Sequence, residues 1–377
     1  MRARNLIALF VLSFMLVACE RTGGLLNPAA GAGPGGFNRQ ALLTNVTDSL
    51  ILPGHDALLT ALRDLEASTR AFAANPNAGT LEAAQKAWLN ANLARMAVLT
   101  YRLGPVDESL LHNRLDNRPP RTAFIDDEIL AGTMPIDAAY IDSIGSSSVG
   151  LGAMEYLLFD PAGGDAAVLA TFSGDGGARR RELLVALAAA MPPKAEELRR
   201  IWAADGENYA AAFVAADMDA GELQGSINML TNQLISDVEQ IINDRLGKPL
   251  GKRTNGALRP DLVEAPYSGA TLPRIIATLQ GQRAVFTGGD GLGLDDYLDF
   301  LGARADDGLL SKAITAQFDA AIAALEAIDG PLETAIYDDP AGVEAAYQEV
   351  FDLLVLLKAD MVNQLGLTLT FNDSDGD

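Results

Sequence analysis

The sequence predicts an all-α protein, because its apolar residues recur at helical spacing and its aromatic content is low. In several segments the apolar side chains fall close to the 3.6-residue period of a helix. One clear stripe comprises Ile227, Leu230, Leu234, Val238, Ile241 and Ile242. Hydrophobic residues make up 49% of the chain and aromatic residues only 6%, which favours helices over a β-sandwich. No segment predicts a strand with comparable clarity.

The N-terminal residues have the pattern of a secretory signal. Arg2 and Arg4 precede an apolar run over 6–17, which is too short to span a bilayer as a mature helix. The run ends in Leu-Val-Ala-Cys at 16–19, which resembles a bacterial lipobox. We therefore expect a signal peptide over residues 1–18 and a lipid on Cys19. The alternative is an ordinary secretory cleavage site that contains a cysteine.

A lipid on Cys19 would attach the protein to a membrane of the cell envelope. Cys19 is the only cysteine in the 377 residues, so its acylation would exclude thiol and disulfide chemistry. Glu20 follows it, and resemblance to other lipoproteins then favours the outer membrane, with the protein facing the periplasm. Residues 19–37 are rich in Gly and Pro and predict a flexible tether.

The charge balance limits the class of partner. The formal net charge is −22, which argues against nucleic acid, because phosphate binding needs a basic surface. Cations or basic partners are the natural electrostatic targets of such a chain.

Helices are expected in sequence after the tether. The first ends at the Asn-Pro-Asn turn of 75–77, and the second runs from Thr80, as its N-cap, to Leu103. Polar residues dominate 104–122, which we expect to be a solvated loop.

The second half of the chain predicts more helices of the same kind. They are expected over 179–190, 193–215 and 223–246, followed by an irregular stretch over 247–270. Ser268 or Thr271 is expected to cap a helix that begins near Leu272. After a glycine-rich turn over 286–294, two long helices complete the body, with Met and aromatic side chains such as Phe351 in the core.

Residues 148–160 form an apolar helical segment interrupted by one acid, Glu155. A charge buried among apolar neighbours is costly, so this carboxylate needs a cation, backbone donors or a metal. Gly150 and Gly152 weaken the helix start but let another backbone or a ligand approach closely. The alternative is a helix N-terminus that holds its acid in solvent.

This segment resembles the signature of imelysin-like proteins, a family once catalogued as M75 peptidases and associated with bacterial iron uptake. The signature is Gly-x-His-x-x-Glu followed by an aromatic-Leu-Leu run, and Gly150, Glu155 and 156–159 match it. The histidine position holds Gly152, as in a branch of the family that has Gly-Leu-x-Ala-Leu-Glu.

Further marks of the family occur in order from about residue 38 to 377. They are a helix with Trp88, a Gly-Pro at 104–105, Arg-x-Asp-x-x-Pro over 114–119, Glu-x-Pro-aromatic-Ser over 264–268, and a C-terminal Asp-Gly-Asp. The resemblance implies two helical-bundle domains side by side, with the signature helix facing the cleft between them. We place these domains at 38–246 and 247–377.

The resemblance, with the residue chemistry, defines the candidate site. The candidate ligand-binding residues are Gly150, Gly152, Glu155, Arg114, Asp116, Glu264 and Ser268. Glu155 is the candidate metal ligand, because ferric iron is a hard ion that accepts carboxylate oxygens. The alternative for Glu155 is a buried ion pair with an arginine such as Arg114, which would tie the helix to 104–122.

Catalysis has less support in the residues. A zinc peptidase needs histidine-rich ligands and a general base, whereas His55 and His112 lie in no such motif and Gly152 offers no ligand. Serine catalysis would need a histidine partner, and no Gly-x-Ser-x-Gly elbow is present. We assign no catalytic residue. We expect a lipoprotein binding module for iron, another divalent cation, a chelate or an envelope partner. A metal-dependent peptidase and an envelope scaffolding protein remain the alternatives.

Overall fold

Helices account for nearly all of the regular structure, as the sequence predicts. The structure, a computed structural model, describes residues 36–216, 225–306 and 308–369. Among these residues the strands are a two-residue hairpin, β1 (Arg304–Ala305) and β2 (Gly308–Leu309), in which Arg304 pairs with Leu309. The expected signal peptide, Cys19, most of the tether and the Asp-Gly-Asp end lie outside the described residues.

The helices of the first half are α1 (Arg39–Asn45), α2 (Leu52–Ala74), α3 (Ala78–Ala97), α4 (Pro105–Glu108), α5 (Leu111–Leu115), α6 (Thr122–Phe124), α7 (Ala138–Ser143), α8 (Gly150–Leu158), α9 (Gly164–Ser173), α10 (Gly177–Trp202) and α11 (Tyr209–Ala215). Those of the second half are α12 (Ser226–Gln240), α13 (Thr271–Thr287), α14 (Leu294–Leu301), α15 (Leu310–Glu326), α16 (Leu332–Asp338), α17 (Pro340–Val355) and α18 (Val362–Leu365). Short π-helical turns adjoin them at Val46–Ile51, Ile125–Leu130, Ile241–Leu246 and Leu356–Met361, and 3-10 turns occur at Leu99–Tyr101, Ser146–Ser148 and Pro260–Leu262.

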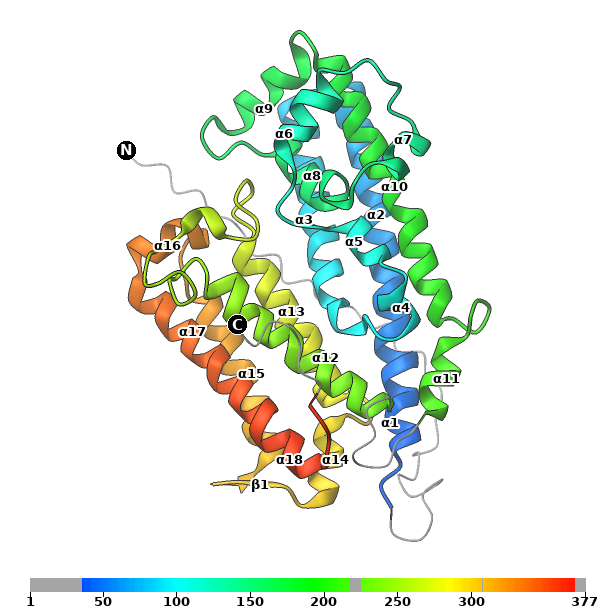
Figure 1. The fold of residues 1–377 in the computed structure, drawn as a ribbon, viewed down its shortest axis with the longest axis vertical. Helices are drawn as coiled ribbons and strands as arrows, with labels where there is room; N and C mark the ends of the chain where they lie inside the picture. The colour runs from blue at the N-terminus through cyan, green and yellow to red at the C-terminus, as the bar shows by residue number, and fades with distance from the viewer. Residues whose placement is uncertain (1–35, 217–224, 307, 370–377) are drawn as a thin grey trace. The chain divides into compact units, whose positions relative to one another are not determined.

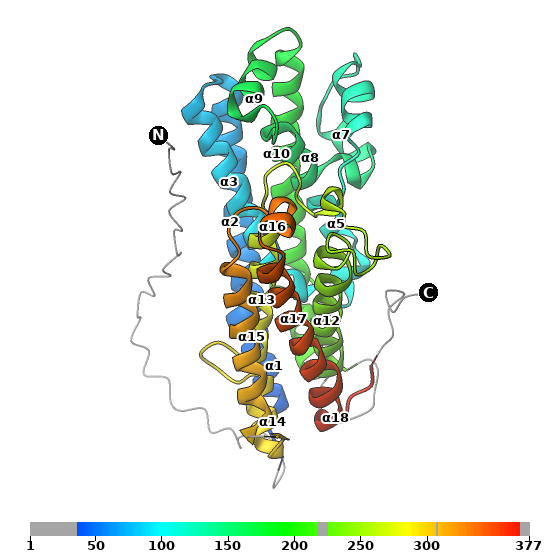
Figure 2. The same ribbon diagram turned by 90° about the vertical axis from the view of Figure 1, so that its left-hand side faces the viewer.

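Two groups of long helices build the core. In the first group α2 packs against both α3 and α10, and in the second α15 packs against both α13 and α17 (Figures 1 and 2). The groups meet where α13 packs on α3. Gly281 of α13 makes this approach close, since a Cβ there would lie 2.4 Å from the carbonyl oxygen of Ala97.

The expected division into two domains stays a prediction. Contacts join the residues from Arg39 onward into one compact unit. Helix α12, which precedes the expected boundary at residue 246, packs against α13 and α17. No helix in the described part of the chain is both long and apolar enough to cross a membrane.

The core confirms most of the predicted apolar stripes. Leu58, Leu62, Leu65 and Phe72 of α2 are fully buried, and the stripe of α12 is buried through Ile242. Phe351 is an exception, because 40% of its side chain is exposed.

Several predicted helix ends are wrong, and local chemistry explains two of them. Asn77 caps α3 in place of Thr80, which instead completes a capping box with it. Neither Ser268 nor Thr271 caps α13; Thr271 accepts a hydrogen bond from the Ala265 amide. No break occurs at Pro192-Pro193, because α10 runs through both prolines and packs along α2.

Candidate functional site

Helix α8 carries Glu155 in a fully buried position. All its residues except Tyr156 are buried, and none of Glu155 is exposed to solvent. The helix begins at Gly150 without a side-chain cap and packs on α3 and α10. The Trp88 indole of α3 donates a hydrogen bond to the Leu151 carbonyl at 2.8 Å, which fixes α8 against α3. The alternative of a solvent-exposed acid at a helix start is therefore wrong.

Both carboxylate oxygens of Glu155 accept hydrogen bonds from protein donors. Oε1 accepts from the Ser268 amide at 2.9 Å, the Ser268 hydroxyl at 2.7 Å and the Tyr267 amide at 3.2 Å. Oε2 pairs with Nη1 of Arg118. Glu155 thus joins the segment before α13 to the segment after α5, and it is held by one cation and three other donors.

The partner of Glu155 is Arg118, which confirms the alternative of a buried ion pair with an arginine of 104–122. Arg114, the arginine named as an example, has other partners. Arg114 donates to the carbonyls of Ile141 and Ile144, each at 2.6 Å, and approaches Asp142 at 4.0 Å. It fastens α5 to the C-terminal end of α7 and to the residue that follows that helix. The spacing of charges in 104–122 could not separate the two arginines, because which of them faces α8 depends on the turn after Leu115.

Asp116 and Glu264 extend the ion pair into a network. Asp116 accepts from Arg118 at 2.9 Å and from Arg274 at 2.7 Å. Glu264 pairs with Arg274 at 2.9 Å and with Arg245 at 2.7 Å. The structure thus brings Asp116, Glu155, Glu264 and Ser268 together, as the candidate site requires.

The arginines determine the charge state of these acids. Burial by itself would raise the pKa of Asp116, but Arg118, Arg274 and Arg95 outweigh it and hold that pKa below its usual value. Burial would likewise raise the pKa of Glu264, and Arg245 and Arg274 reverse the effect and lower it strongly. Burial alone would lower the pKa of Arg274, whereas Asp116 and Glu264 raise it.

The expectation of a solvated loop over 104–122 is wrong at its centre. The side chains of Asp116 and Arg118 are only 4% and 7% exposed, and His112 is buried. Sequence reasoning also missed Arg245 and Arg274, which lie in apolar helical runs. The signal that could have found them is the one used for Glu155: an ionisable residue on an apolar face needs a partner.

The two signature glycines have different roles. Gly150 has φ +70° and its backbone bridges to Asp116; a Cβ there would lie 2.3 Å from the Leu115 carbonyl oxygen. A Cβ on Gly152 would make ordinary contacts, 3.4 Å to the Asn117 carbonyl oxygen and 3.5 Å to Cγ of Arg118. The stem of Arg118 therefore occupies the space beside position 152.

This donor set does not fit a bare metal ion. A metal on Glu155 would have to displace Arg118 or the donors of Ser268, and the neighbouring carboxylates are already paired with arginines. Within the described ranges, no group of three or more His, Cys, Asp or Glu side chains is placed to hold a metal. The hydroxyl of Ser268 donates to Glu155 and has no imidazole beside it.

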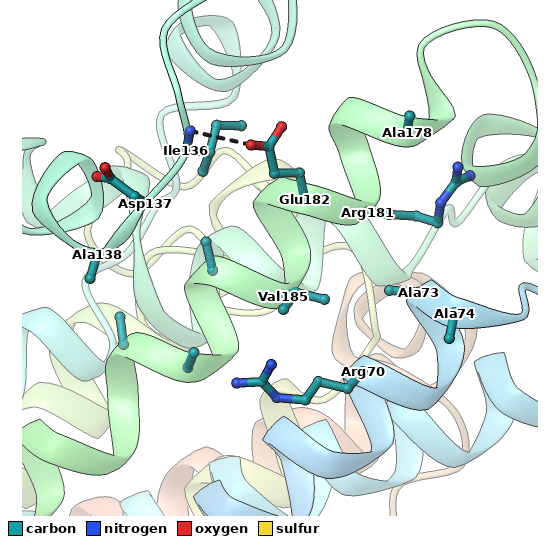
Figure 3. Close-up of a pocket in the computed structure, with 13 residues that line it drawn as sticks. Arg70, Ala73, Ala74, Ile136, Asp137, Ala138, Ala178, Arg181, Glu182 and Val185 are labelled. Atoms are coloured by element: carbon teal, nitrogen blue, oxygen red, sulfur yellow. Dashed lines mark hydrogen bonds between the residues drawn. The ribbon is translucent and has the colours of Figure 1, made fainter.

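A groove lies apart from this network, between α2, α10 and residues 136–138 (Figure 3). It encloses about 620 Å³ and is lined mostly by alanines. Its four charged groups already have partners. Arg70 pairs with Glu66, and Arg181 donates to the Phe172 carbonyl. Glu182 accepts from the Ile136 amide, and Asp137 accepts from the Tyr140 amide. None of the candidate site residues lines it.

Comparisons with known proteins agree with this architecture. The Iron-regulated protein A of Synechococcus elongatus is 26% identical over 307 residues, which cover 78% of this chain and 79% of that protein. An imelysin-like protein from Psychrobacter arcticum 273-4 shares the fold with a TM-score of 0.69 and 16% identity. A putative iron-regulated protein A precursor from Parabacteroides distasonis does so with a TM-score of 0.70 and 18% identity. Each of these two structures matches 89% of this chain and 97% of its own. The sequence model of the imelysin family matches residues 51–357, and the chain therefore belongs to the imelysin family.

Proposed function

We propose that this protein is a non-enzymatic binding module of the cell envelope with a role in iron physiology, anchored to the outer membrane through Cys19. The curated relative named Iron-regulated protein A supports the link to iron. The apolar N-terminal run that ends at Cys19 supports the anchor.

One observation carries the non-enzymatic part of the proposal. Both carboxylate oxygens of Glu155, the acid of the signature helix, accept hydrogen bonds from Arg118, Tyr267 and Ser268. A carboxylate held in this way is neither an open metal ligand nor a general base, because it is fully buried and its charge is paired with Arg118. Glu155 then serves to join α8 to the 116–118 segment and to the start of α13.

In this proposal the protein binds an iron chelate or an envelope protein. It does not bind a bare metal ion through Glu155. Calorimetric titration of the purified protein tests this with ferric, ferrous, zinc and calcium ions and with ferric citrate as a chelate probe. Bare ions should bind weakly and salt-sensitively, as expected for a chain with net charge −22, and Glu155→Gln should leave that binding unchanged. Stoichiometric ion binding that Glu155→Gln abolishes would overturn the assignment of this residue.

Uptake of iron by cells tests the physiological role. A deletion strain should take up less radiolabelled iron from ferric citrate, and the wild-type gene should restore the uptake. Unchanged iron uptake would reject the role in iron physiology and would favour the alternative of an envelope scaffolding protein. Metal-dependent cleavage of a peptide library that persists through stringent purification would instead establish a peptidase.

Lipid attachment is tested separately. Cells that express the protein should incorporate labelled palmitate into it, and Cys19→Ser should abolish the labelling and release the protein from the membrane fraction. A Cys19→Ser protein that stays in the outer-membrane fraction would show that another feature holds it there.

A further inference from the structure

Around Glu155 and Asp237, four buried or partly buried carboxylates pair with four arginines, and a fifth arginine has no ion-pair partner in the described part of the chain. Four carboxylates each contact at least one arginine: Asp116, Glu155, Glu264 and Asp237. Four arginines supply these contacts: Arg102, Arg118, Arg245 and Arg274. These eight side chains balance in charge. A fifth arginine, Arg95 near the C-terminal end of α3, lies in the same region and adds one positive charge.

Arg95 has no acceptor among the described residues. It is 4% exposed, and its Nε is buried without a hydrogen-bond partner. Asp116 and Asp237 are the acids that act on its charge, but neither forms an ion pair with it. Asp237 already accepts from Thr100, Arg102 and Gln233, and Asp116 from Arg118 and Arg274. Burial lowers the pKa of Arg95 to about 10, which still leaves the guanidinium charged at neutral pH.

Two buried histidines on which the charge of Arg95 acts also keep polar atoms without partners. Both ring nitrogens of His55 on α2 and Nδ1 of His112 on α5 are buried and unpaired. Burial, reinforced by the charge of Arg95, lowers the pKa of His55 to about 4 and that of His112 to about 3. Each ring is thus neutral at physiological pH and offers one N–H donor.

A buried, unpaired cation is costly, and a buried polar atom without a partner indicates a water or ion that completes it. We propose that Arg95, with His55 and His112, forms a buried site for one small monovalent anion, a halide or a small oxyanion such as formate. The guanidinium supplies charge and forked donors, and the two imidazole N–H groups supply neutral donors. The surrounding burial restricts the anion to a few atoms. This site is independent of the proposed role in iron physiology.

Thermal unfolding under controlled anion conditions tests the proposal. The protein is exchanged into sodium gluconate, whose anion is too large for the site, and titrated with chloride or formate at constant ionic strength. The unfolding midpoint should rise saturably by roughly 2–4 °C, because an anion that binds the folded state stabilises it. A midpoint equal in all three salts would overturn the proposal.

Variants of Arg95 separate site binding from general salt effects. Arg95→Met keeps the apolar stem and removes the charge, so its midpoint should not respond to chloride or formate, and in gluconate it should equal or exceed that of the wild type. Arg63→Met is the matched control, since Arg63 is exposed and pairs with Glu196; it should keep the full response. A response retained in Arg95→Met would place the anion elsewhere. If Arg95→Met does not fold, chloride-35 NMR of the wild type decides: line broadening that formate reverses is expected, and no broadening would reject the site.

Discussion

Arg118 supplies the positive charge that neutralises Glu155, and its position determines how α8 is held. Its Nη1 contacts Glu155 and also the Glu264 carbonyl at 3.1 Å, while its Nε contacts Asp116 at 2.9 Å. The guanidinium also lies 5.9 Å from the centroid of the Trp88 ring. One side chain thus links α3, α8 and the segment before α13.

Removal of the Arg118 side chain should therefore destabilise the folded protein strongly. Arg118→Met leaves Glu155 as an unpaired buried charge, so we expect a loss of about 3–5 kcal/mol in the free energy of unfolding, measured with denaturant. The double variant Arg118→Met, Glu155→Gln should recover much of that loss, because no charge is then left unpaired. Arg63→Met, in an exposed ion pair, should cost about 1 kcal/mol or less. Equal losses in the two single variants would contradict the role given to Arg118.

A side chain at position 152 would occupy space beside the stem of Arg118. The effect of a substitution at 152 on stability should therefore depend on the size of the new side chain. Gly152→Ala adds a Cβ at ordinary contact distance, 3.5 Å from Cγ of Arg118, and should be tolerated. Gly152→His, which restores the family's signature residue, would have to displace the Arg118 stem and should cost about 1–3 kcal/mol by denaturant unfolding. If Gly152→His is as stable as Gly152→Ala, Arg118 does not fill that space.

At the scale of helices, the contact between α13 and α3 carries the network. Arg274 on α13 pairs with Asp116 and Glu264 and donates to Asn92 of α3, and all these contacts require the two helices to approach closely. Gly281 permits the approach about two turns further along α13. Long-range packing also keeps α10 continuous through Pro192, which is buried, although proline interrupts an isolated helix.

A methyl group at 281 should separate the two helices. Gly281→Ala places a Cβ 2.4 Å from the Ala97 carbonyl oxygen, so we expect destabilisation of about 1–3 kcal/mol even though Ala favours a helix. The control is Gly145→Ala, where a Cβ would meet nothing within 4 Å. Midpoints of denaturant unfolding compare the two variants. A Gly281→Ala protein as stable as the wild type would show that α13 and α3 can separate without loss.

For the whole molecule, the buried histidines and carboxylates predict a loss of stability in acid. The folded-state pKa of His55 is about 4 against 6.5 in the unfolded chain, so the unfolded chain binds the proton first as pH falls. Stability from this residue is complete above pH 6.5 and is lost between 6.5 and about 4, with a magnitude of about 3 kcal/mol. Asp116 and Glu264, whose pKa values are lowered, lose their contribution at still lower pH.

His55→Leu should flatten the upper part of this profile. The free energy of unfolding, measured from pH 7 to 4 at fixed salt composition, should fall less in His55→Leu than in the wild type. His112 should account for much of the remaining slope in the variant. Parallel profiles for the wild type and His55→Leu would show that His55 does not stay neutral in the folded protein.

The sequence indicated the three acids and Ser268 of the network but not the arginines that pair with them. Glu155 was identified because an acid among apolar neighbours needs a partner, and Asp116, Glu264 and Ser268 because they match family motifs. Arg114 was named only as an example of the partner of Glu155, because Arg114 and Arg118 lie in the same polar stretch and nothing local distinguishes them. Arg245 and Arg274 were missed because their partners lie 19 and 158 residues away in the chain, at Glu264 and Asp116.

What the sequence determined by itself is the all-α class, most of the buried helical stripes and the need of Glu155 for a partner. These follow from periodicity and from the cost of burying a charge, which act within one segment. The tertiary structure alone decided that Arg118 fills the space beside Gly152, that α10 continues through two prolines, and that Arg95 is left unpaired. Each of these depends on which surfaces meet when α3, α8 and α13 pack, and such contacts join segments that are distant in the chain.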